Sequence, residues 1–571
     1  MLERGPKWRA AGARRLAPIH GPGFDQVGPL GVIAVTRLPS WGRYAGESSD
    51  FPTFMAISHP PALPRPGVRI GFDTPPPRGL SSAWGRGCGE RPFVGYSAGT
   101  RETTPLVVDL DGTLIKSDLL VESFFSLLAS HPAAALRSLL SLTDGRAALK
   151  ARIADEAVVE LHNLPFDAEV LAFLRAEKAK GRRLYLASAT DRRLVEAVAA
   201  HVGLFDGAFG SDGTVNLSGA RKAELLCREF GEHGFDYIGN APEDIPVWRR
   251  CATPLAANAP PALVRRLKRR HPQVVTLGSQ KPRLADYLRA LRLHQWLKNV
   301  LIFVPLLAGH VLTPEAVTRA AIAFVAFSLC ASSVYLLNDF LDLANDRDHA
   351  TKRHRPLASG AVPVLHAVAL IPVLLAAALL LGLAASAQVL GILVLYYLTT
   401  LAYSLLLKRR LLVDVMTLSV LYTLRIFAGG VAVAIPISPW LMGFSIFLFL
   451  CLALVKRTTE LEACARQGKA MPRGRGYVVG DAPMLGSLGA ASGYGAVLVL
   501  ALYINSPEVR SLYATPEYLW LVCLLLLHWV SRVLMLAHRG EMHDDPIIFA
   551  VKDRTSLITG ALVFAVVVAS T

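Results

Sequence analysis

Residues 338–346 read Asn-Asp-Phe-Leu-Asp-Leu-Ala-Asn-Asp and stand where a long apolar segment gives way to charged residues. The three aspartates are spaced three and then four residues apart, which on a helix places their carboxylates on one face. Residues 318–337 before them are almost wholly apolar and long enough to cross a bilayer. Acids at a membrane boundary are costly unless cations neutralise them, so they indicate a functional site. Because Mg²⁺ binds carboxylates and is commonly shared with substrate phosphates, the stretch predicts magnesium-assisted handling of a diphosphate.

Apolar segments recur through the second half of the chain. At 571 residues the chain is too long for one compact domain, and 52% of its residues are hydrophobic. The sequence predicts nine membrane spans, at about 297–313, 318–337, 364–384, 387–407, 412–434, 438–455, 485–504, 517–537 and 555–571. We therefore expect residues 285–571 to form an all-α membrane bundle of about nine transmembrane helices.

Positive charge alternates between the loops of this predicted bundle. Lys and Arg gather in loops 338–356, 408–410 and 456–475 and in the stretch 538–554, whereas the opposite loops contain only Arg510. Because cytoplasmic loops carry the excess of Lys and Arg, a multi-pass cell-membrane protein with its acidic site and soluble domain in the cytoplasm is predicted. The net charge of +16 then fits membrane loops and anionic phosphate substrates, not nucleic acid, and the sequence identifies no protein partner.

The membrane half resembles the UbiA prenyltransferase superfamily, whose members share a nine-helix intramembrane bundle. Asn338, Asp339, Asp342 and Asp346 match the superfamily's first aspartate-rich motif in full. The resemblance implies that the three aspartates are catalytic and hold Mg²⁺ on the diphosphate of a donor, with Asn338 binding substrate. Lys456-Arg457-x-x-Glu460 occupies the place of the second acidic motif and departs from the usual D-x-x-x-D, which leaves Glu460 as a candidate metal ligand.

Within the superfamily, the likeness is closest to polyprenyl-phosphate phosphoribosyltransferases. It rests on residues 292–299, 347–356 and 424–430. Phosphoribosyl pyrophosphate and an allylic prenyl diphosphate both lose diphosphate from a cation-like carbon. The acids therefore recognise the diphosphate leaving group and do not indicate which of the two donors is used. Basic side chains suited to phosphate oxygens, some of them serving only as topology signals, are Lys298, Lys352, Arg353, Arg355, Lys408 and Lys456.

Three functions remain open for the membrane half. The leading hypothesis is transfer from a magnesium-bound diphosphate donor with a polyprenyl lipid as partner substrate, forming polyprenyl-phosphoryl ribose 5-phosphate. The alternative within the class moves a prenyl group to an aromatic or other small acceptor. A non-catalytic lipid-binding or transport protein belongs to another class, and the intact acids of 338–346 argue against it.

Residues 101–275 have the pattern of a soluble α/β domain. Short buried strands are predicted at 105–110, 183–188 and 236–239, with helical patterns between them and a mostly helical insert at about 119–164. Strands alternating with helices favour a parallel, Rossmann-like sheet. Asp109 and Asp111 follow the first strand, at the edge of a parallel sheet where ligands bind. Two carboxylates at this spacing can divide nucleophilic attack and proton transfer between them.

This domain resembles the haloacid dehalogenase superfamily, mostly magnesium-dependent phosphatases, over about residues 104–260. The resemblance makes Asp109 the nucleophile and Asp111 the acid/base, both of them also metal ligands. It gives the phosphate-binding hydroxyl to Ser188 and the phosphoryl-stabilising amine to Lys222. Asn240 and Asp244 match the metal-binding acidic motif, with Asn240 standing where an Asp is usual. The insert would be a helical cap that admits small substrates; a retained fold without catalysis is the alternative.

Residues 1–100 carry no functional assignment. They are rich in Pro and Gly without a period, the composition of a disordered segment, and Met55 inside them raises the alternative of a mis-assigned start. The predicted order is thus a disordered segment, a haloacid dehalogenase-like hydrolase domain over 101–275 and a transmembrane transferase domain over 285–571.

Overall fold

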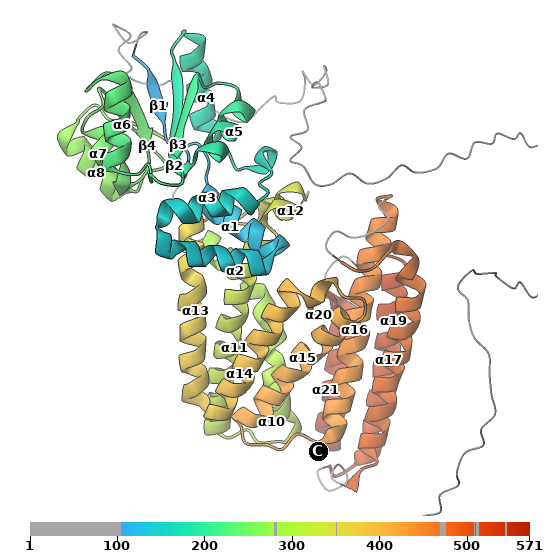
Figure 1. The fold of residues 1–571 in the computed structure, drawn as a ribbon. Helices are drawn as coiled ribbons and strands as arrows, with labels where there is room; N and C mark the ends of the chain where they lie inside the picture. Colours follow the sequence, from blue (N-terminus) through green and yellow to red (C-terminus); the bar gives the residue numbers. More distant parts are fainter. Residues whose placement is uncertain are drawn as a thin grey trace, which may run out of the picture. The chain divides into compact units, whose positions relative to one another are not determined.

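The computed structural model describes residues 104–278, 282–349, 351–468, 475–507, 509, 513–542 and 545–571. The prediction of a disordered or mis-assigned segment at 1–100 lies outside these residues. Figure 1 shows an α/β domain and a set of long helices within the described part of the chain.

The α/β domain is built on one six-stranded parallel sheet with the strand order β3-β2-β1-β4-β5-β6. The strands are β1 Leu106–Val108, β2 Leu184–Asp191, β3 Gly207–Ser211, β4 Asp236–Gly239, β5 Pro254–Ala257 and β6 Val275–Leu277. Strands β2 and β3 are added on one side of β1, and strands β4, β5 and β6 are added on its other side. The strand order therefore reverses beside β1, which is where such sheets leave a crevice for ligands at the carboxyl ends of the strands.

Helices cover both faces of this sheet. One apolar cluster joins β1 and β2 to α4 and α5, and a second joins the other face to α6, α7 and α8. Their bounds are α4 Ala168–Ala179, α5 Arg192–Val202, α6 Ala220–Phe230, α7 Ile245–Trp248 and α8 Pro261–Arg270. Because both faces are buried, β1 is continuously apolar, and the predicted α/β layer architecture is confirmed.

The insert between β1 and β2 is helical, as the sequence predicts. It consists of α1 Leu119–Ser130, α2 Pro132–Leu140, the 3₁₀ turns η1 Ser141–Asp144 and η2 Leu161–Asn163, and α3 Arg146–Glu156. Asp118 caps α1 by accepting the backbone N–H of Val121 at 3.0 Å. This placement of a helical cap directly after Asp109 and Asp111 brings it to the carboxyl end of the sheet.

The second half is a bundle whose long helices run side by side (Figure 1). Seven helices of the described residues are long and apolar enough to cross a membrane. They are α11 Pro314–Leu341, α13 Val364–Ala385, α14 Ala387–Leu405, α15 Val413–Ala432, α16 Pro439–Arg466, α17 Ala482–Ile504 and α19 Trp520–His538. The protein is thus a multi-pass membrane protein.

The two remaining predicted spans take a different form. The first becomes the 3₁₀ segment η4 Leu293–Phe303 followed by the short α10 Val304–Ala308, which together are shorter than a membrane-crossing helix. The last is part of a broken pair, α20 Pro546–Lys552 and α21 Arg554–Ser570, bent by 81°. Counting that pair as one span gives eight, so the count of nine remains a prediction.

Candidate active sites

The carboxyl end of β1 carries a buried carboxylate paired with a lysine. Asp109 directly follows the strand, and its backbone N–H donates to the carbonyl of Ile238 at 2.9 Å. Lys222 on α6 donates from Nζ to Asp109 Oδ1 at 2.7 Å. Burial raises the pKa of Asp109 to about 7, and the charge of Lys222 opposes that rise. Lys222 is therefore the residue that favours the ionised, nucleophilic form of this carboxylate.

Asp111 is held by hydroxyl groups of the neighbouring strand β2. Ser188 and Thr190 both donate to Asp111 Oδ2 at 2.9 Å, and the backbone N–H of Leu119 donates to Oδ1 at 2.7 Å. Sequence reasoning found Ser188 and missed Thr190, although residues two apart on a strand point to the same face. These contacts fix the orientation of a carboxyl group that can exchange protons beside Asp109.

Asp244 supports the lysine from the end of β4. Its Oδ1 accepts a 2.7 Å hydrogen bond from the hydroxyl of Tyr237, which in turn accepts one from Lys222 at 3.0 Å. Its Oδ2 accepts the backbone N–H groups of Asn240 and Ala241 at 3.0 and 3.1 Å. Both oxygens of Asp244 thus have protein donors, and its predicted role as a metal ligand stays a prediction.

Asn240 lies against the glycine of the first motif. Gly112 has a φ of +74°, and a Cβ built there would lie 2.0 Å from Asn240 Nδ2. Any larger residue at this position would displace the Asn240 side chain, so the glycine brings the loops after β1 and β4 together. The carboxylates of Asp109 and Asp111 and the amide oxygen of Asn240 are the types of ligand that Mg²⁺ prefers.

The cap adds a lysine that sequence reasoning missed. Lys150 on α3 donates from Nζ to the carbonyl of Ala189 at 2.6 Å and to Asn216 Oδ1 at 2.8 Å. Burial lowers the pKa of Lys150, while the charges of Asp111 and Asp118 act in the opposite direction. The contact joins residues 39 positions apart, and a lone lysine in a helical insert carries no sequence signal for it.

In the bundle, the aspartates of residues 338–346 are held in two ways. Asp339 and Asp346 are buried, and Arg355 contacts both of them, 3.3 Å from Asp339 Oδ1. Asp342 lies at the break between α11 and α12 Leu343–Asp348, and its side chain is 42% exposed. It pairs with Lys408 at 3.1 Å. The sequence predicts that three carboxylates share one helix face. In the structure Asp339 and Asp346 share Arg355, whereas Asp342 pairs separately with Lys408.

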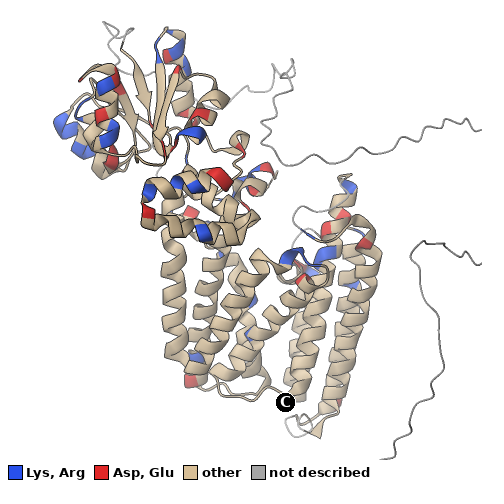
Figure 2. Cartoon of the chain, in the orientation of Figure 1, with Lys and Arg blue, Asp and Glu red and all other residues tan. Residues whose placement is uncertain are grey.

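The cations around these acids differ in part from those predicted. Arg355 and Lys408 reach the aspartates, and Arg292, which the sequence analysis did not select as a site residue, contacts Asp339. Lys352 and Arg353 are exposed and make no ion pair within the described residues. Figure 2 shows that the charged residues of the bundle concentrate towards one end of its long helices.

This site offers the ligand atoms that a hard cation prefers, but within the described residues its three carboxylates do not all lie within 4.8 Å of one another. Asn338 Oδ1 is buried and accepts no hydrogen bond among the described residues. With the carboxylates of Asp339, Asp342 and Asp346 it offers oxygen ligands at the membrane boundary, the type that Mg²⁺ prefers. A bound Mg²⁺ would offset the negative charge of a leaving diphosphate, and the surrounding arginines would hold its outer oxygens.

A second cluster of charged groups contains Lys456, which the sequence analysis selected as a phosphate-binding candidate. Lys456 on α16 and Lys298 on η4 each approach Asp545 Oδ2 at 2.9 Å. Asp545, which precedes α20, was not found from sequence. Glu460 pairs instead with Arg457, whose guanidinium also donates to Asp414 at 2.6 Å. Both acids are therefore already paired, and metal binding by Glu460 stays a prediction.

The cap contacts the bundle beside the aspartates. Glu122 on α1 forms a two-pronged ion pair with Arg347 on α12, at 2.9 and 2.7 Å, and both side chains are buried. Phe125 stacks on Phe340, a residue of the motif itself, with ring centroids 4.5 Å apart. The hydrolase-like cap and the membrane site thus share an interface made of an ion pair and an aromatic pair.

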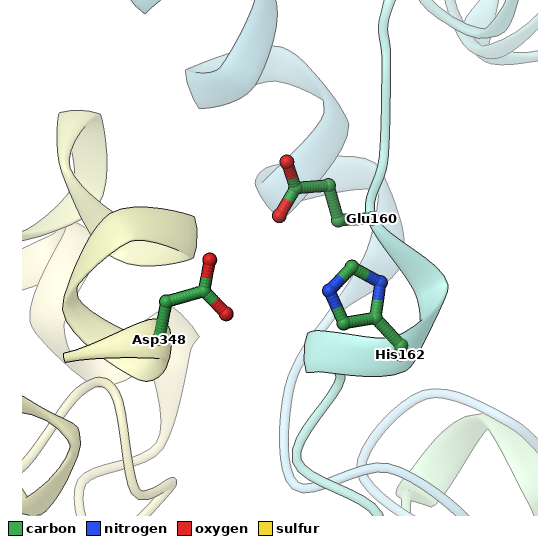
Figure 3. A group of neighbouring side chains, drawn as sticks. All are labelled: Glu160, His162 and Asp348. Atoms are coloured by element: carbon green, nitrogen blue, oxygen red, sulfur yellow. The ribbon is translucent and has the colours of Figure 1, made fainter. Parts of the chain in front are cut away.

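One group of potential metal ligands lies at the same boundary. Glu160, His162 and Asp348 have ligand atoms within 4.8 Å of one another, and Figure 3 shows them facing a common space from two segments of the chain. All three are exposed. Exposed groups of this kind are common without an ion, so we assign no metal to them.

Comparison with known proteins matches both halves of the chain. Residues 301–552 match the UbiA prenyltransferase family and residues 106–249 match the haloacid dehalogenase-like hydrolases. An uncharacterised protein of Sinorhizobium fredii, y4nM, is 39% identical over 463 residues, which are 80% of this chain and 89% of that protein. The decaprenyl-phosphate phosphoribosyltransferase of Mycobacterium tuberculosis is 38% identical over 193 residues, 33% of this chain and 64% of the enzyme.

The structure of a UbiA homolog from Archaeoglobus fulgidus bound to GPP and Mg²⁺ is 17% identical, with a TM-score of 0.40 over 49% of this chain and 99% of that one.

These halves define a class of protein: a multi-pass membrane transferase with a hydrolase-type α/β domain preceding its bundle. The chain belongs to the UbiA prenyltransferase family and carries a haloacid dehalogenase-like hydrolase domain ahead of the family's helices.

Proposed function

We propose that the bundle transfers a phosphoribosyl group from phosphoribosyl pyrophosphate to a polyprenyl phosphate. The observation that carries this proposal is the presence of two groups of cations. Arg292, Arg355 and Lys408 surround the aspartates, and Lys298 and Lys456 converge elsewhere on Asp545. A reaction between two anionic substrates needs two such groups. The likeness to a decaprenyl-phosphate phosphoribosyltransferase supports the choice of substrates.

The proposed reaction breaks one bond and forms one at the ribose C1. An oxygen of the lipid phosphate attacks C1, the bond from C1 to the diphosphate oxygen breaks, and diphosphate leaves with the bonding electrons. The products are polyprenyl-phosphoryl ribose 5-phosphate and diphosphate. Arg292 and Arg355 would hold the leaving group, while Mg²⁺ on Asn338 and the three aspartates would neutralise its growing charge.

A labelling experiment separates this reaction from prenyl transfer. Membranes containing the full chain would be incubated with polyprenyl phosphate and labelled phosphoribosyl pyrophosphate, and in parallel with labelled prenyl diphosphates and aromatic acceptors. We expect label from phosphoribosyl pyrophosphate in a new anionic lipid, dependent on added Mg²⁺. Label entering a product only from a prenyl diphosphate would replace our proposal by the alternative reaction.

We further propose that the α/β domain removes the 5-phosphate from that lipid product. Asp109 would attack phosphorus, and Asp111 would protonate the departing ribose oxygen and then accept a proton from the attacking water. The contact between the cap and α12 supports a shared substrate, because a tethered phosphatase meets its substrate at an effective concentration in the millimolar range (about 1 mM).

The test compares lipid products of the parent and of Asp109→Asn. We expect the variant to accumulate the phosphorylated lipid, while Asp144→Asn, an exposed change in the cap, leaves the product ratio as in the parent. Equal ratios in the parent and Asp109→Asn would show that the lipid is not the substrate, and a soluble phosphate ester would take its place.

We also propose the finer points of architecture that the sequence predicts. The acidic site and the α/β domain face the cytoplasm, supported by the basic loops on one side of the bundle. The segment η4–α10 and the bent pair α20–α21 complete nine membrane segments. The domains span 101–275 and 285–571.

A further inference from the structure

Three cations gather around Tyr422 inside the bundle. The guanidinium carbon of Arg425 lies 5.2 Å from the centre of the Tyr422 ring, and Lys298 Nζ lies 5.8 Å from it. Lys456 joins them through Asp545, which accepts a hydrogen bond from each lysine at 2.9 Å. Arg425 is only 5% exposed, and cations at this depth in a membrane protein are costly unless they serve a ligand or a partner.

Asp545 is the carboxylate that contacts this cluster within the described residues. Arg425 has neutral partners instead: it donates to Asn299 Oδ1 and to the hydroxyl of Tyr396, each at 2.8 Å, and to the carbonyl of Leu421. Three positive side chains therefore face Asp545, while the Glu460 carboxylate near Lys456 is already paired with Arg457. The remaining positive charge would attract an anion larger than a carboxylate.

The geometry of the lysines indicates where that anion binds. Both lysines approach the same atom, Asp545 Oδ2, from different elements, η4 and α16. Two ammonium groups converging on one oxygen reproduce the surroundings of a phosphate oxygen. The Lys456 side chain is 34% exposed, so the cluster is reachable from solvent, while those of Lys298 and Asp545 are each 11% exposed.

This cluster is made of residues other than the cations that contact the aspartates. Arg292, which contacts Asp339, lies at the start of η4, and Lys298 lies six residues further along it. At the rise of a 3₁₀ helix the two positions are about 12 Å apart along the axis. One element thus contributes a cation to each group, an arrangement that suits two anionic ligands bound next to each other.

We propose that Lys298, Lys456 and Arg425 form a site for a phosphate monoester, and that the Asp545 carboxylate occupies it until the ligand displaces it. The assignment of the ligand as the phosphate group of the lipid acceptor rests on the proposed function. The 5-phosphate of the donor has the same chemistry and is the second possible source.

The test measures binding to the full-length protein in lipid nanodiscs, without a reaction. The probes are a polyprenyl phosphate, the corresponding polyprenol and ribose 5-phosphate, and the readout is the dissociation constant of each. For the parent protein we expect the polyprenyl phosphate to bind at least about tenfold more tightly than the polyprenol, the value of one hydrogen bond to a charged group.

Variants then distinguish a ligand site from a structural ion pair. Lys298→Met and Lys456→Met should each weaken binding of the phosphate probe about tenfold or more. Asp545→Asn should strengthen it about tenfold, because the competing charge is removed while Asn still caps α20. A gain in affinity cannot result from misfolding. The matched control is Asp553→Asn, which caps α21 and pairs with Arg532, and should leave the affinity unchanged.

The outcomes separate this inference from the proposed function. Unchanged binding in both lysine variants, or weaker binding in Asp545→Asn, would overturn the inference. Lysine-dependent binding of ribose 5-phosphate alone would support the site and assign it to the donor. If the lipid phosphate binds in a lysine-dependent manner while no transfer from phosphoribosyl pyrophosphate is detected, that result would support the site and refute the proposed reaction.

Discussion

Asp342 is the member of the aspartate motif least engaged by the protein itself. Asp339 and Asp346 are buried against arginines, whereas Asp342 is half-exposed with Lys408 as its ion-pair partner. Replacing Asp342 should therefore have little effect on the stability of the fold. The main effect should be the loss of its carboxylate as a metal ligand. This difference makes it the most selective probe of metal binding in the motif.

We predict that Asp342→Asn lowers the transfer rate about a hundredfold or more, the usual loss of a charged stabiliser of the leaving group. Asp339→Asn should lower it as much, and both variants should still insert in the membrane. The rate of lipid labelling and the yield of detergent-extracted protein are the measurements. Glu315→Gln, an exposed change at the opposite end of α11, is the control. Activity of either variant within a few-fold of the parent would refute a role in metal binding.

At the scale of single residues, the sequence predicts a site when the partners are near in sequence or share a motif. Asp109, Asp111 and Ser188 lie together because parallel strands end at one edge of the sheet, and Lys222 reaches Asp109 from α6. Arg292 and Asp545 were missed because neither belongs to a motif that indicates its partner, whereas Lys222, 113 residues from Asp109, was identified by its motif. Such contacts depend on helix packing, which no local pattern encodes.

Among the elements, α1 connects the α/β domain to the bundle through Glu122 and Phe125. The Glu122–Arg347 pair is buried on both sides, so loss of one partner leaves an uncompensated charge. Such a loss typically costs about 3–5 kcal/mol, whereas removing both charges together costs much less. The strength of this contact can therefore be tested by a pair of single variants and their combination.

We predict that Glu122→Leu and Arg347→Met each increase hydrogen exchange in α1 and α12, and that the double variant restores much of the protection. Exchange measured by mass spectrometry on the full chain reports both helices at once. Glu196→Gln, which removes an exposed pair with Arg192 on α5, should leave both helices unchanged. If the single variants match the parent in α1, the ion pair does not hold the cap.

The elements themselves were largely predictable, and their exceptions have physical causes. Helices α5 and α6 lie between the predicted strands at 183–188 and 236–239, where helical patterns were expected, because amphipathic periodicity reports the face that packs on a sheet. The expected span at 297–313 failed as a single helix. Its composition is apolar, but the chain there forms a 3₁₀ segment and a short helix that begins just before Pro305.

For the whole molecule, the basic loops predict that Asp109, Asp339 and Glu460 all face the cytoplasm. A single cysteine introduced in loop 351–356 or at the exposed end of α16 should react with an impermeant maleimide only after cells are opened. A cysteine at the exposed Leu312, before α11, should react from outside. Labelling of the first two sites in intact cells would reverse the proposed orientation.

The attachment of the cap also determines which part of the hydrolase domain can move. In a capped phosphatase, substrate enters when the cap and the sheet separate. Here Glu122 and Phe125 fix the cap to Arg347 and Phe340 of the bundle, so the cap is the stationary part. In the proposed phosphatase, opening would then move the sheet, with Asp109 and Lys222, away from Lys150. The body that moves in the proposed phosphatase would therefore be the entire Rossmann-like core, which is far larger than a lid.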